Sequence, residues 1–274
     1  MRQRILVTGG TGTLGRVVVH RLLERGGQVR VLSRHGRLAD MPAAVEWMVG
    51  DLVRGEGLEA AVAGVGVIVH GATDVRRPRA DIDATRNLVE TARAWGTPHL
   101  VYVSIVGVDT VPLGYYRAKL AAEQVVEGSG LPWTILRATQ FHDLVLRVAA
   151  TLARLPVMPV PAGTSLQPVD VGEVAARLAD IATGEPSGRV PEMGGPHVRD
   201  FAGLMRAYLT ARGRRRLIVP VRVPGAVAAA YRSGGHLTPQ HATGRRSWEE
   251  FLADRYGPRT RSSPKYGGAA DSRS

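Results

Sequence analysis

The sequence predicts an α/β fold in which a doubly wound parallel sheet is followed by a small C-terminal lobe. Short apolar runs alternate with segments of helical periodicity through the first half of the chain, a pattern typical of βαβ units. The first apolar run ends in a glycine-rich turn that opens a helix. After about Thr139 the alternation loosens, which indicates a part of different construction.

The predicted strands are runs rich in Val, Ile and Leu, bounded by turn-forming residues. They lie at residues 4–10, 28–34, 45–51, 65–72, 99–104 and 132–138. Apolar residues three and four apart predict helices at residues 16–27, 55–64, 81–96 and 115–130. Because crossovers between parallel strands are right-handed, these helices should cover both faces of the sheet.

The C-terminal lobe is expected to be mostly helical. Amphipathic helices are predicted at residues 141–155, 199–213 and 248–257, and residues 157–163 are expected to form a Pro-rich connection. Within residues 166–184, a short strand should precede a helix that is capped by Asp170. We expect this lobe over the carboxyl edge of the sheet, where open α/β sheets bind ligands.

Composition narrows the class of partner. The net charge is +12, but the arginines are spread along the chain and aromatic residues make up only 5%, so nucleic acid is disfavoured. The chain contains no Cys, which excludes disulfides and Cys-ligated zinc and is compatible with a cytoplasmic setting. Apolar runs are too short for a signal peptide or a membrane span, so no membrane association is expected.

The turn after the first strand carries Gly9, Gly12 and Gly15 in a Gly-x-x-Gly-x-x-Gly arrangement. Glycines there permit a tight turn and let backbone amides approach a ligand closely. The helix that follows supplies unpaired N–H donors and a partial positive charge. Between a strand and a helix, this arrangement predicts a site for the diphosphate of a dinucleotide.

The same turn, Thr8-Gly9-Gly10-Thr11-Gly12-Thr13-Leu14-Gly15, resembles the fingerprint of the extended and atypical short-chain dehydrogenases/reductases, especially the NmrA-like branch. The likeness continues in family order through "GDL", "ATRNLVETARAWGTPHLVYVS", "YYRAKLAAE", "GLPWTILRATQF" and "QPVDVGEVA", and covers roughly residues 3 to 183. It implies a Rossmann-type fold and a nicotinamide cofactor.

The tip of the second strand favours NADP over NAD. An acidic residue there would bind the ribose hydroxyls of NAD and repel a 2′-phosphate. Instead, Ser33 and Arg34 stand at the tip and Arg37 is nearby. A guanidinium pairs well with phosphate. In so Arg-rich a chain, an arginine could also fall here by chance.

The resemblance implies further cofactor contacts. They are Thr11, Thr13 and Leu14 in the turn, Asp51 and Leu52 beside the adenine, Gly71 and Ala72 along the dinucleotide, and Ala138 and Gln140 near the nicotinamide. For Asp51, capping of its own loop is an equal alternative.

Tyr115 and Lys119 lie four residues apart on one predicted helix, so both can project into one site. An ammonium near a phenol favours the phenolate and lowers the phenol pKa. Lys119 is one of two lysines in a chain that otherwise uses Arg, which favours a functional role. In the family that the motif resembles, the Tyr is the acid/base and the Lys also holds the nicotinamide ribose. Tyr116 is one residue off and should point elsewhere.

The fifth strand ends Ser104-Ile105, where family enzymes usually have paired hydroxyls. The second hydroxyl typically polarises the substrate carbonyl, and successive side chains on a strand point to opposite faces. Ser104 remains a catalytic candidate, although a strand-end role is favoured. Thr73, Thr139 or Gln140 could replace the missing donor, or the site could bind cofactor without turning over substrate.

Other polar residues are interpreted as structural. The histidines show no metal-ligand spacing, so no metal site is expected. His142 is a weaker candidate for the pocket lining. Arg137 could border the nicotinamide or be an ion-pair partner. Asn87 resembles the family residue that ties neighbouring backbone together.

We therefore expect an NADP-dependent oxidoreductase that reduces a carbonyl, quinone or enone of a small apolar molecule. The alternative is an NADP-binding sensor of the NmrA-like type, which would need a protein partner. A nucleotide-sugar epimerase is disfavoured, since its C-terminal domain is usually longer. Residues 1–256 should form one unit, with a dinucleotide-binding core at 1–140 and a substrate lobe within 141–256, followed by a disordered tail at 257–274. The sequence leaves a homo-oligomer open.

Overall fold

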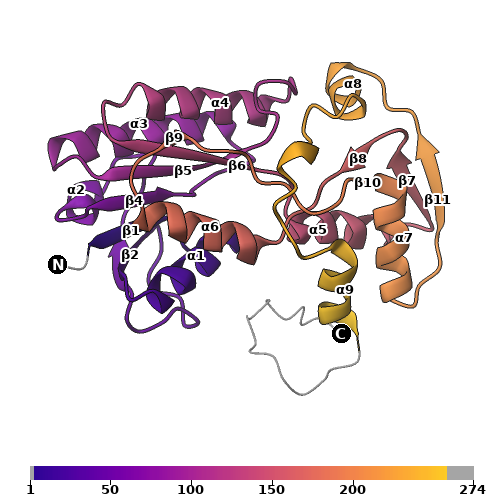
Figure 1. Cartoon of the computed structure of the whole chain (residues 1–274), viewed down its shortest axis with the longest axis horizontal. Coiled ribbons are helices and arrows are strands. Elements are labelled where there is room, and N and C mark those ends of the chain that lie inside the picture. The colour runs from indigo at the N-terminus through magenta and orange to yellow at the C-terminus, as the bar shows by residue number, and fades with distance from the viewer. Residues whose placement is uncertain (1–2, 258–274) are drawn as a thin grey trace.

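The computed structural model describes residues 3–257, and within them the main sheet has seven strands that are all parallel. Their spatial order is β3-β2-β1-β4-β5-β6-β9 (Figure 1). The strands are β1 (Arg4–Thr8), β2 (Gln28–Ser33), β3 (Glu46–Val49), β4 (Val67–His70), β5 (His99–Ile105), β6 (Trp133–Ala138) and β9 (Gly188–Arg189). The order reverses between β1 and β4, which is the topological switch point where such sheets bind ligands.

Helices cover both faces of this sheet because alternate strand residues point to opposite sides. Ile5 and Val7 of β1 face one core with the helices α1 (Thr13–Glu24) and α6 (Val171–Thr183). Leu6 faces the other core, which contains the helices α2 (Leu58–Val62), α3 (Pro78–Ala94) and α4 (Gly114–Glu127). The predicted doubly wound parallel sheet is confirmed.

The remaining elements build a lobe with its own core beside the sheet (Figure 1). Its helices are α5 (His142–Leu152), α7 (Phe201–Ala211), α8 (Ala226–Arg232), α9 (Trp248–Tyr256) and the 3-10 turn η1 (Pro239–His241). Its strands are β7 (Val157–Pro161), β8 (Ser165–Leu166), β10 (Arg199–Asp200) and β11 (Leu217–Val221). Met158, Tyr208 and Phe251 lie in its apolar core.

Two details of this lobe differ from the sequence-based expectation. The stretch expected to be a Pro-rich connection forms strand β7, which pairs in parallel with β11. Proline is tolerated there because the sheet has only two strands, and each strand keeps an edge on which no N–H is needed. Helix α8 was not predicted, because its seven residues are too few for a clear period.

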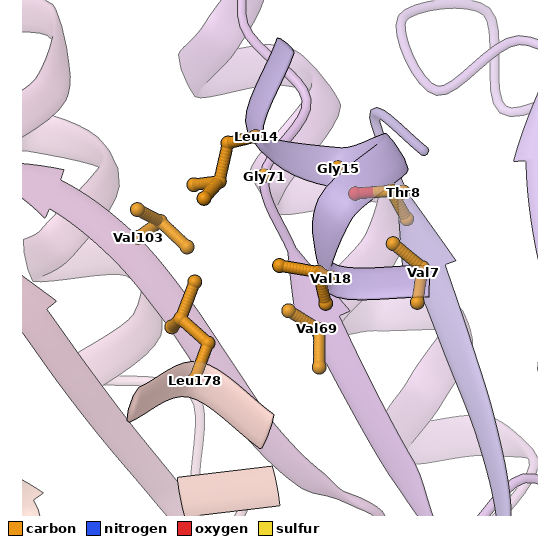
Figure 2. A pocket seen from close by; sticks show the side chains of 9 residues that line it. All are labelled: Val7, Thr8, Leu14, Gly15, Val18, Val69, Gly71, Val103 and Leu178. Atoms are coloured by element: carbon orange, nitrogen blue, oxygen red, sulfur yellow. The ribbon is translucent and has the colours of Figure 1, made fainter. Parts of the chain in front are cut away.

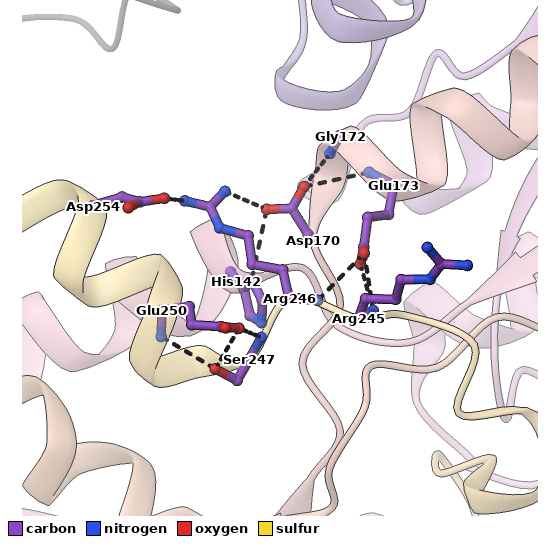
Figure 3. A network of polar contacts seen from close by, with 9 residues as sticks. All are labelled: His142, Asp170, Gly172, Glu173, Arg245, Arg246, Ser247, Glu250 and Asp254. Atoms are coloured by element: carbon purple, nitrogen blue, oxygen red, sulfur yellow. Dashed lines mark hydrogen bonds and ion pairs between the residues drawn. The ribbon is translucent and has the colours of Figure 1, made fainter. Parts of the chain in front are cut away.

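Asp170 anchors the lobe to the sheet domain (Figure 3). Its Oδ1 accepts hydrogen bonds from the amides of Gly172 and Glu173, which confirms the predicted cap of α6. Its Oδ2 pairs at 2.7 Å with Arg246, which precedes α9 and also reaches Asp254 at 2.5 Å. A single carboxylate therefore fixes the start of α6 and the approach to α9.

No helix within residues 3–257 is both long and apolar enough to cross a bilayer. The disordered tail predicted for residues 257–274 lies, apart from Gly257, outside the described residues.

Candidate active site

The glycine turn packs directly against the loop that follows β4. Gly9 has φ +70°, and a Cβ there would lie 2.7 Å from backbone atoms of Gly71 and Ala72. A Cβ at Gly15 would lie 2.1 Å from the Gly9 carbonyl oxygen, which is an impossible distance. Four of the residues predicted to bind the dinucleotide therefore meet in one place.

The N-terminus of α1 has the properties of an anion site. Gly12 is its N-cap and provides no side-chain hydrogen bond to the first amides. The first turn of α1, which lies within the residues that the structure describes, contains no acidic residue. The amides and the helix dipole fit a diphosphate. Arg16, which sequence reasoning missed, donates from Nε to the Thr11 carbonyl at 2.9 Å and pairs with Asp40. This contact stabilises the turn.

A small cavity lies behind the turn (Figure 2). Its volume is about 10 Å³, and Leu14, Val18, Val103 and Leu178 line it together with the turn. This space is about that of one water molecule. A space of this size is too small for a dinucleotide.

At the tip of β2 the three predicted residues have different contacts. The Ser33 hydroxyl accepts a hydrogen bond from the His35 amide at 3.2 Å. Arg37 donates to the carbonyls of Ala43 and Val45 and so holds its own loop. Arg34 is exposed. Of the two predicted arginines, Arg34 is the one whose guanidinium is not engaged by that loop.

The loop after β3 is held by two side chains. The Asp51 carboxylate accepts from the Val53 amide at 2.8 Å, so it caps its own loop as one of the two interpretations expected. Asn87 on α3 donates to the carbonyls of Leu52 and Val53, both at 2.9 Å. The predicted tying role of Asn87 is confirmed.

Lys119 is buried on α4 beneath the end of β5. Its Nζ donates to the Val103 carbonyl at 2.8 Å and lies 4.2 Å from the centre of the Tyr102 ring. Burial lowers its pKa to about 8, while the nearby Asp81 and Glu123 carboxylates favour the charged form. The ammonium is thus held rigidly next to the strand end.

Tyr115, one turn earlier on α4, points its hydroxyl at Thr73 in the loop after β4. The two oxygens are 2.9 Å apart. The pKa of Tyr115 is raised, mainly by burial, and the Asp81 charge adds to the rise. The expectation that Lys119 holds this pKa below its ordinary value is wrong for this arrangement, because burial dominates and the ammonium is directed at a carbonyl.

Ile105 has an apolar setting that explains the missing hydroxyl. It packs with Tyr115 against the cluster of Val108, Val111 and Tyr116, which helix α8 also contacts. Tyr116 bonds instead to Tyr231, with 3.2 Å between their hydroxyl oxygens. As predicted, Tyr116 is directed away from the Thr73 contact that Tyr115 makes.

Ser104 lies on the side of β5 that faces an ion-pair cluster. It is buried and sits beside the Glu123 carboxylate, without a hydrogen bond of regular geometry. Arg137, its register partner on β6, pairs with both oxygens of Glu123, at 2.9 and 2.7 Å, and with Asp109 at 2.8 Å. Arg137 is thus an ion-pair partner, the second of its two predicted interpretations.

The other alternative donors are engaged elsewhere. Thr139 donates to the Gln167 carbonyl at 2.5 Å. Gln140 is buried, and its amide nitrogen reaches the His236 carbonyl at 3.5 Å. Ala138, which was predicted to lie near the nicotinamide, is buried on β6. His142 is enclosed by Trp248 and Phe251 in the lobe. Thr73 is therefore the one of the three donors that contacts Tyr115.

An open cavity of about 470 Å³ adjoins the first residue of α4. Arg77, Pro78 and Arg79 at the start of α3 line it together with Gly114. Of its lining residues, Gly114 directly precedes Tyr115 in the sequence. Among residues 3–257 no cluster of His, Cys, Asp and Glu could hold a metal ion.

Residues 9–181, more than half of the chain, match a protein family described as NAD(P)H-binding. The chain belongs to this family. The resemblance to short-chain dehydrogenases/reductases is thereby confirmed, and the family match spans the glycine turn, Tyr115 and Lys119.

Relatives in the family have differing named roles. A (4-alkanoyl-5-oxo-2,5-dihydrofuran-3-yl)methyl phosphate reductase of Streptomyces griseus is 32% identical over 197 residues, which is 70% of this chain and 68% of that protein. The photosystem II assembly factor Ycf39 of Cyanophora paradoxa is 29% identical over 237 residues, which is 80% of this chain and 71% of that protein. Ycf39 of Trieres chinensis is 30% identical over 185 residues, and this chain spans 57% of its length.

Solved structures of the same fold include two with a TM-score of 0.77 and 18% identity. One is an NADPH-dependent quinone oxidoreductase of Escherichia coli complexed with NADPH, matched over 92% of this chain and 99% of that one. The other is a nucleoside-diphosphate-sugar epimerase of Staphylococcus aureus, matched over 93% of this chain and 100% of that one. At this identity the likeness establishes the fold.

Asp81, like Arg16, is a polar residue of the site that sequence reasoning missed. It is 5% exposed, accepts a short hydrogen bond from Thr73, and receives the Asp74 amide at 2.7 Å. In the sequence it stands at the expected start of a helix, where an Asp usually indicates capping or a dipole effect. Because the helix begins at Pro78 instead, Asp81 lies within the first turn and faces inward.

Proposed function

We propose that this chain is an NADPH-dependent reductase of a carbonyl, quinone or enone on a small apolar molecule. One observation carries the proposal: the phenol of Tyr115 stands at the switch-point side of the sheet with a hydrogen-bonding partner, and the buried ammonium of Lys119 is one helical turn away. Tyr115 and Lys119 lie beside the ends of β4 and β5, respectively. The nicotinamide of a bound dinucleotide would reach this place.

The chain's residues would divide the work as follows. The amides of the glycine turn bind the diphosphate, and Arg34 pairs with the 2′-phosphate. Lys119 holds the nicotinamide ribose, as the family resemblance implies, and Tyr115 gives a proton to the substrate oxygen. Bound NADPH supplies the hydride. Ser104 keeps its place as a secondary candidate at the end of β5.

The character of the pocket supports an apolar carbonyl substrate. Ile105 and the cluster around Tyr116 give the wall next to Tyr115 an aliphatic and aromatic surface. Two proteins compared above support reduction of conjugated carbonyls: the relative named as a dihydrofuran phosphate reductase, and the quinone oxidoreductase of the same fold.

The test is turnover of NADPH with a panel of quinones, enones and ketones. Replacing Tyr115 with Phe should lower kcat by about 10²- to 10⁴-fold, the usual contribution of a general acid. Lys119→Ala should also lower kcat and should weaken cofactor binding. Tyr116→Phe, which removes the neighbouring hydroxyl, is the matched control and should stay close to the parent.

The second candidate is an NADP-binding sensor of the NmrA-like type. Ile105 in place of a hydroxyl favours it, and so does the relative named as an assembly factor. A parent protein that binds NADPH, but whose turnover equals that of Tyr115→Phe and Lys119→Ala, would favour the sensor. Failure to bind any nicotinamide dinucleotide would contradict both functions.

A further inference from the structure

Asp81, Thr73 and Tyr115 form a continuous hydrogen-bonded chain from α3, across the loop after β4, to α4. The Thr73 hydroxyl donates to Asp81 Oδ2, and the oxygens of Thr73 and Tyr115 are 2.9 Å apart. The other Asp81 oxygen accepts the Asp74 amide at 2.7 Å. Both carboxylate oxygens thus have a partner inside the protein, and the side chain is closed off from solvent.

The carboxylate determines the direction of every hydrogen bond in this chain. An ionised carboxylate accepts only, and a hydroxyl has one hydrogen to give. Because Asp81 takes the hydrogen of Thr73, the Thr73 oxygen can only accept from Tyr115. The phenol proton of Tyr115 is therefore directed at Thr73 while Asp81 is charged.

This direction disfavours the phenolate form of Tyr115. A phenolate would need the Thr73 hydroxyl to donate to it, and Thr73 can do so only by releasing Asp81. The phenolate would also carry a second negative charge close to a buried carboxylate, which is costly at low dielectric. Both effects act in the same sense.

We propose that Asp81, acting through Thr73, keeps Tyr115 in its protonated form and so biases the site toward reduction. Reduction needs a phenol that gives a proton to the substrate oxygen as hydride arrives at the carbon. The resulting phenolate then regains a proton from solvent. Oxidation needs a phenolate that accepts a proton from an alcohol. Asp81 is a positioning residue here, and the assignment of direction rests on the proposed function.

The other charged and titratable groups around Tyr115 do not cancel this effect. Lys119 is the cation one turn further along the same helix, and its ammonium is directed at the Val103 carbonyl. Tyr102 on β5 and Tyr116 on α4 are neutral neighbours. Asp74 in the loop is paired with Arg77. Burial, as the largest cause, and the Asp81 charge both raise the Tyr115 pKa.

The test is the pKa of Tyr115, measured by NMR on protein labelled with ¹³C at the tyrosine ring carbon bonded to oxygen. The Tyr115 signal is assigned as the one missing from Tyr115→Phe. Asp81→Asn should lower this pKa by about one pH unit or more, because it removes the charge and frees the Thr73 hydrogen. Thr73→Val removes the hydroxyl through which Asp81 acts but leaves the Asp81 charge in place, so it should lower this pKa by less than Asp81→Asn does.

Asp83→Asn is the matched control, since Asp83 is exposed on the same helix and pairs with Arg86. It should leave the Tyr115 pKa unchanged. An unchanged or raised pKa in Asp81→Asn would overturn the inference, and so would an unchanged or raised pKa in Thr73→Val. If Asp81→Asn does not fold, an unchanged or raised pKa in the folded Thr73→Val variant is sufficient to overturn it.

Turnover separates this inference from the proposed function. In an active enzyme, the alkaline limb of kcat/KM for reduction should move to lower pH in Asp81→Asn. The ratio of kcat for oxidation to kcat for reduction, measured at one pH with saturating substrates, should rise. Activity with an unmoved Tyr115 pKa contradicts the inference alone. Absence of activity with a lowered pKa contradicts the proposed function and leaves the Asp81–Thr73–Tyr115 coupling established.

Discussion

At the scale of single residues, charge and hydrogen-bond direction decide what this site can do. Arg34 and Arg37 have the same chemistry and stand three positions apart, yet the structure uses them differently. Arg37 closes its own loop by donating to the Ala43 and Val45 carbonyls. Arg34 is exposed and available to a phosphate, so the two should contribute unequally to cofactor choice.

Arg34→Ser should weaken NADPH binding by about 10- to 100-fold, which corresponds to the loss of a hydrogen bond to a charged group. NADH binding should stay near the parent value, since NADH has no 2′-phosphate. Fluorescence titration with both cofactors measures this. The exposed Arg93→Ser variant controls for the loss of one positive charge. Equal losses for NADPH and NADH would contradict the role of Arg34.

At the scale of elements, the turn from β1 to α1 works because two backbones pass closer than a side chain allows. Gly15 lies against the Gly9 carbonyl, and Gly9 lies against the loop after β4. This contact fixes α1 relative to both strands and leaves its first amides facing outward. Packing and the proposed binding of the diphosphate therefore depend on the same atoms.

Gly15→Ala should destabilise the fold by about 2 kcal/mol or more, because the new Cβ must push the turn apart. It should also abolish dinucleotide binding. Urea unfolding and fluorescence titration measure the two effects. At Gly36 a Cβ would meet nothing within 4 Å, so Gly36→Ala should unfold like the parent. A stable Gly15→Ala variant that binds NADPH normally would contradict this account of the turn.

At the scale of the whole molecule, the lobe is joined to the sheet domain through Asp170 and Arg246 (Figure 3). Although burial opposes it, the pKa of Asp170 is lowered to about 2 by His142, by Arg246 and by the amide at the start of α6. A carboxylate with a lowered pKa stabilises the fold above its unfolded-state pKa. That stabilisation is lost as the pH falls through the folded-state value.

Arg246→Ala should lower the free energy of unfolding by about 2 kcal/mol at neutral pH, because it removes a charged hydrogen bond from the buried Asp170 carboxylate. Between about pH 4 and pH 2 the parent should lose more stability than the variant. Urea unfolding at each pH gives both values. Asp254→Asn removes only the exposed partner of the same guanidinium and should cost less than about 1 kcal/mol. Parallel pH curves for the parent and Arg246→Ala would contradict this coupling.

Local sequence was sufficient for the architecture and the cofactor class. Alternating residues such as Ile5, Leu6 and Val7 must face opposite sides of a strand, so a run that is apolar throughout requires helices on both faces. Gly9, Gly12 and Gly15 predict the turn because glycine alone tolerates that close approach. Both depend on neighbours in sequence, which is why both were predictable.

Only the tertiary structure decided which polar groups meet. Thr73 and Tyr115 are 42 residues apart, and Asp81 contacts Thr73 from a helix whose start sequence reasoning placed three residues too late. Likewise, strand β7 was read as a connection because its partner β11 lies some sixty residues further along the chain. A hydrogen bond between distant segments depends on how the elements pack, and no local pattern of residues encodes that distance.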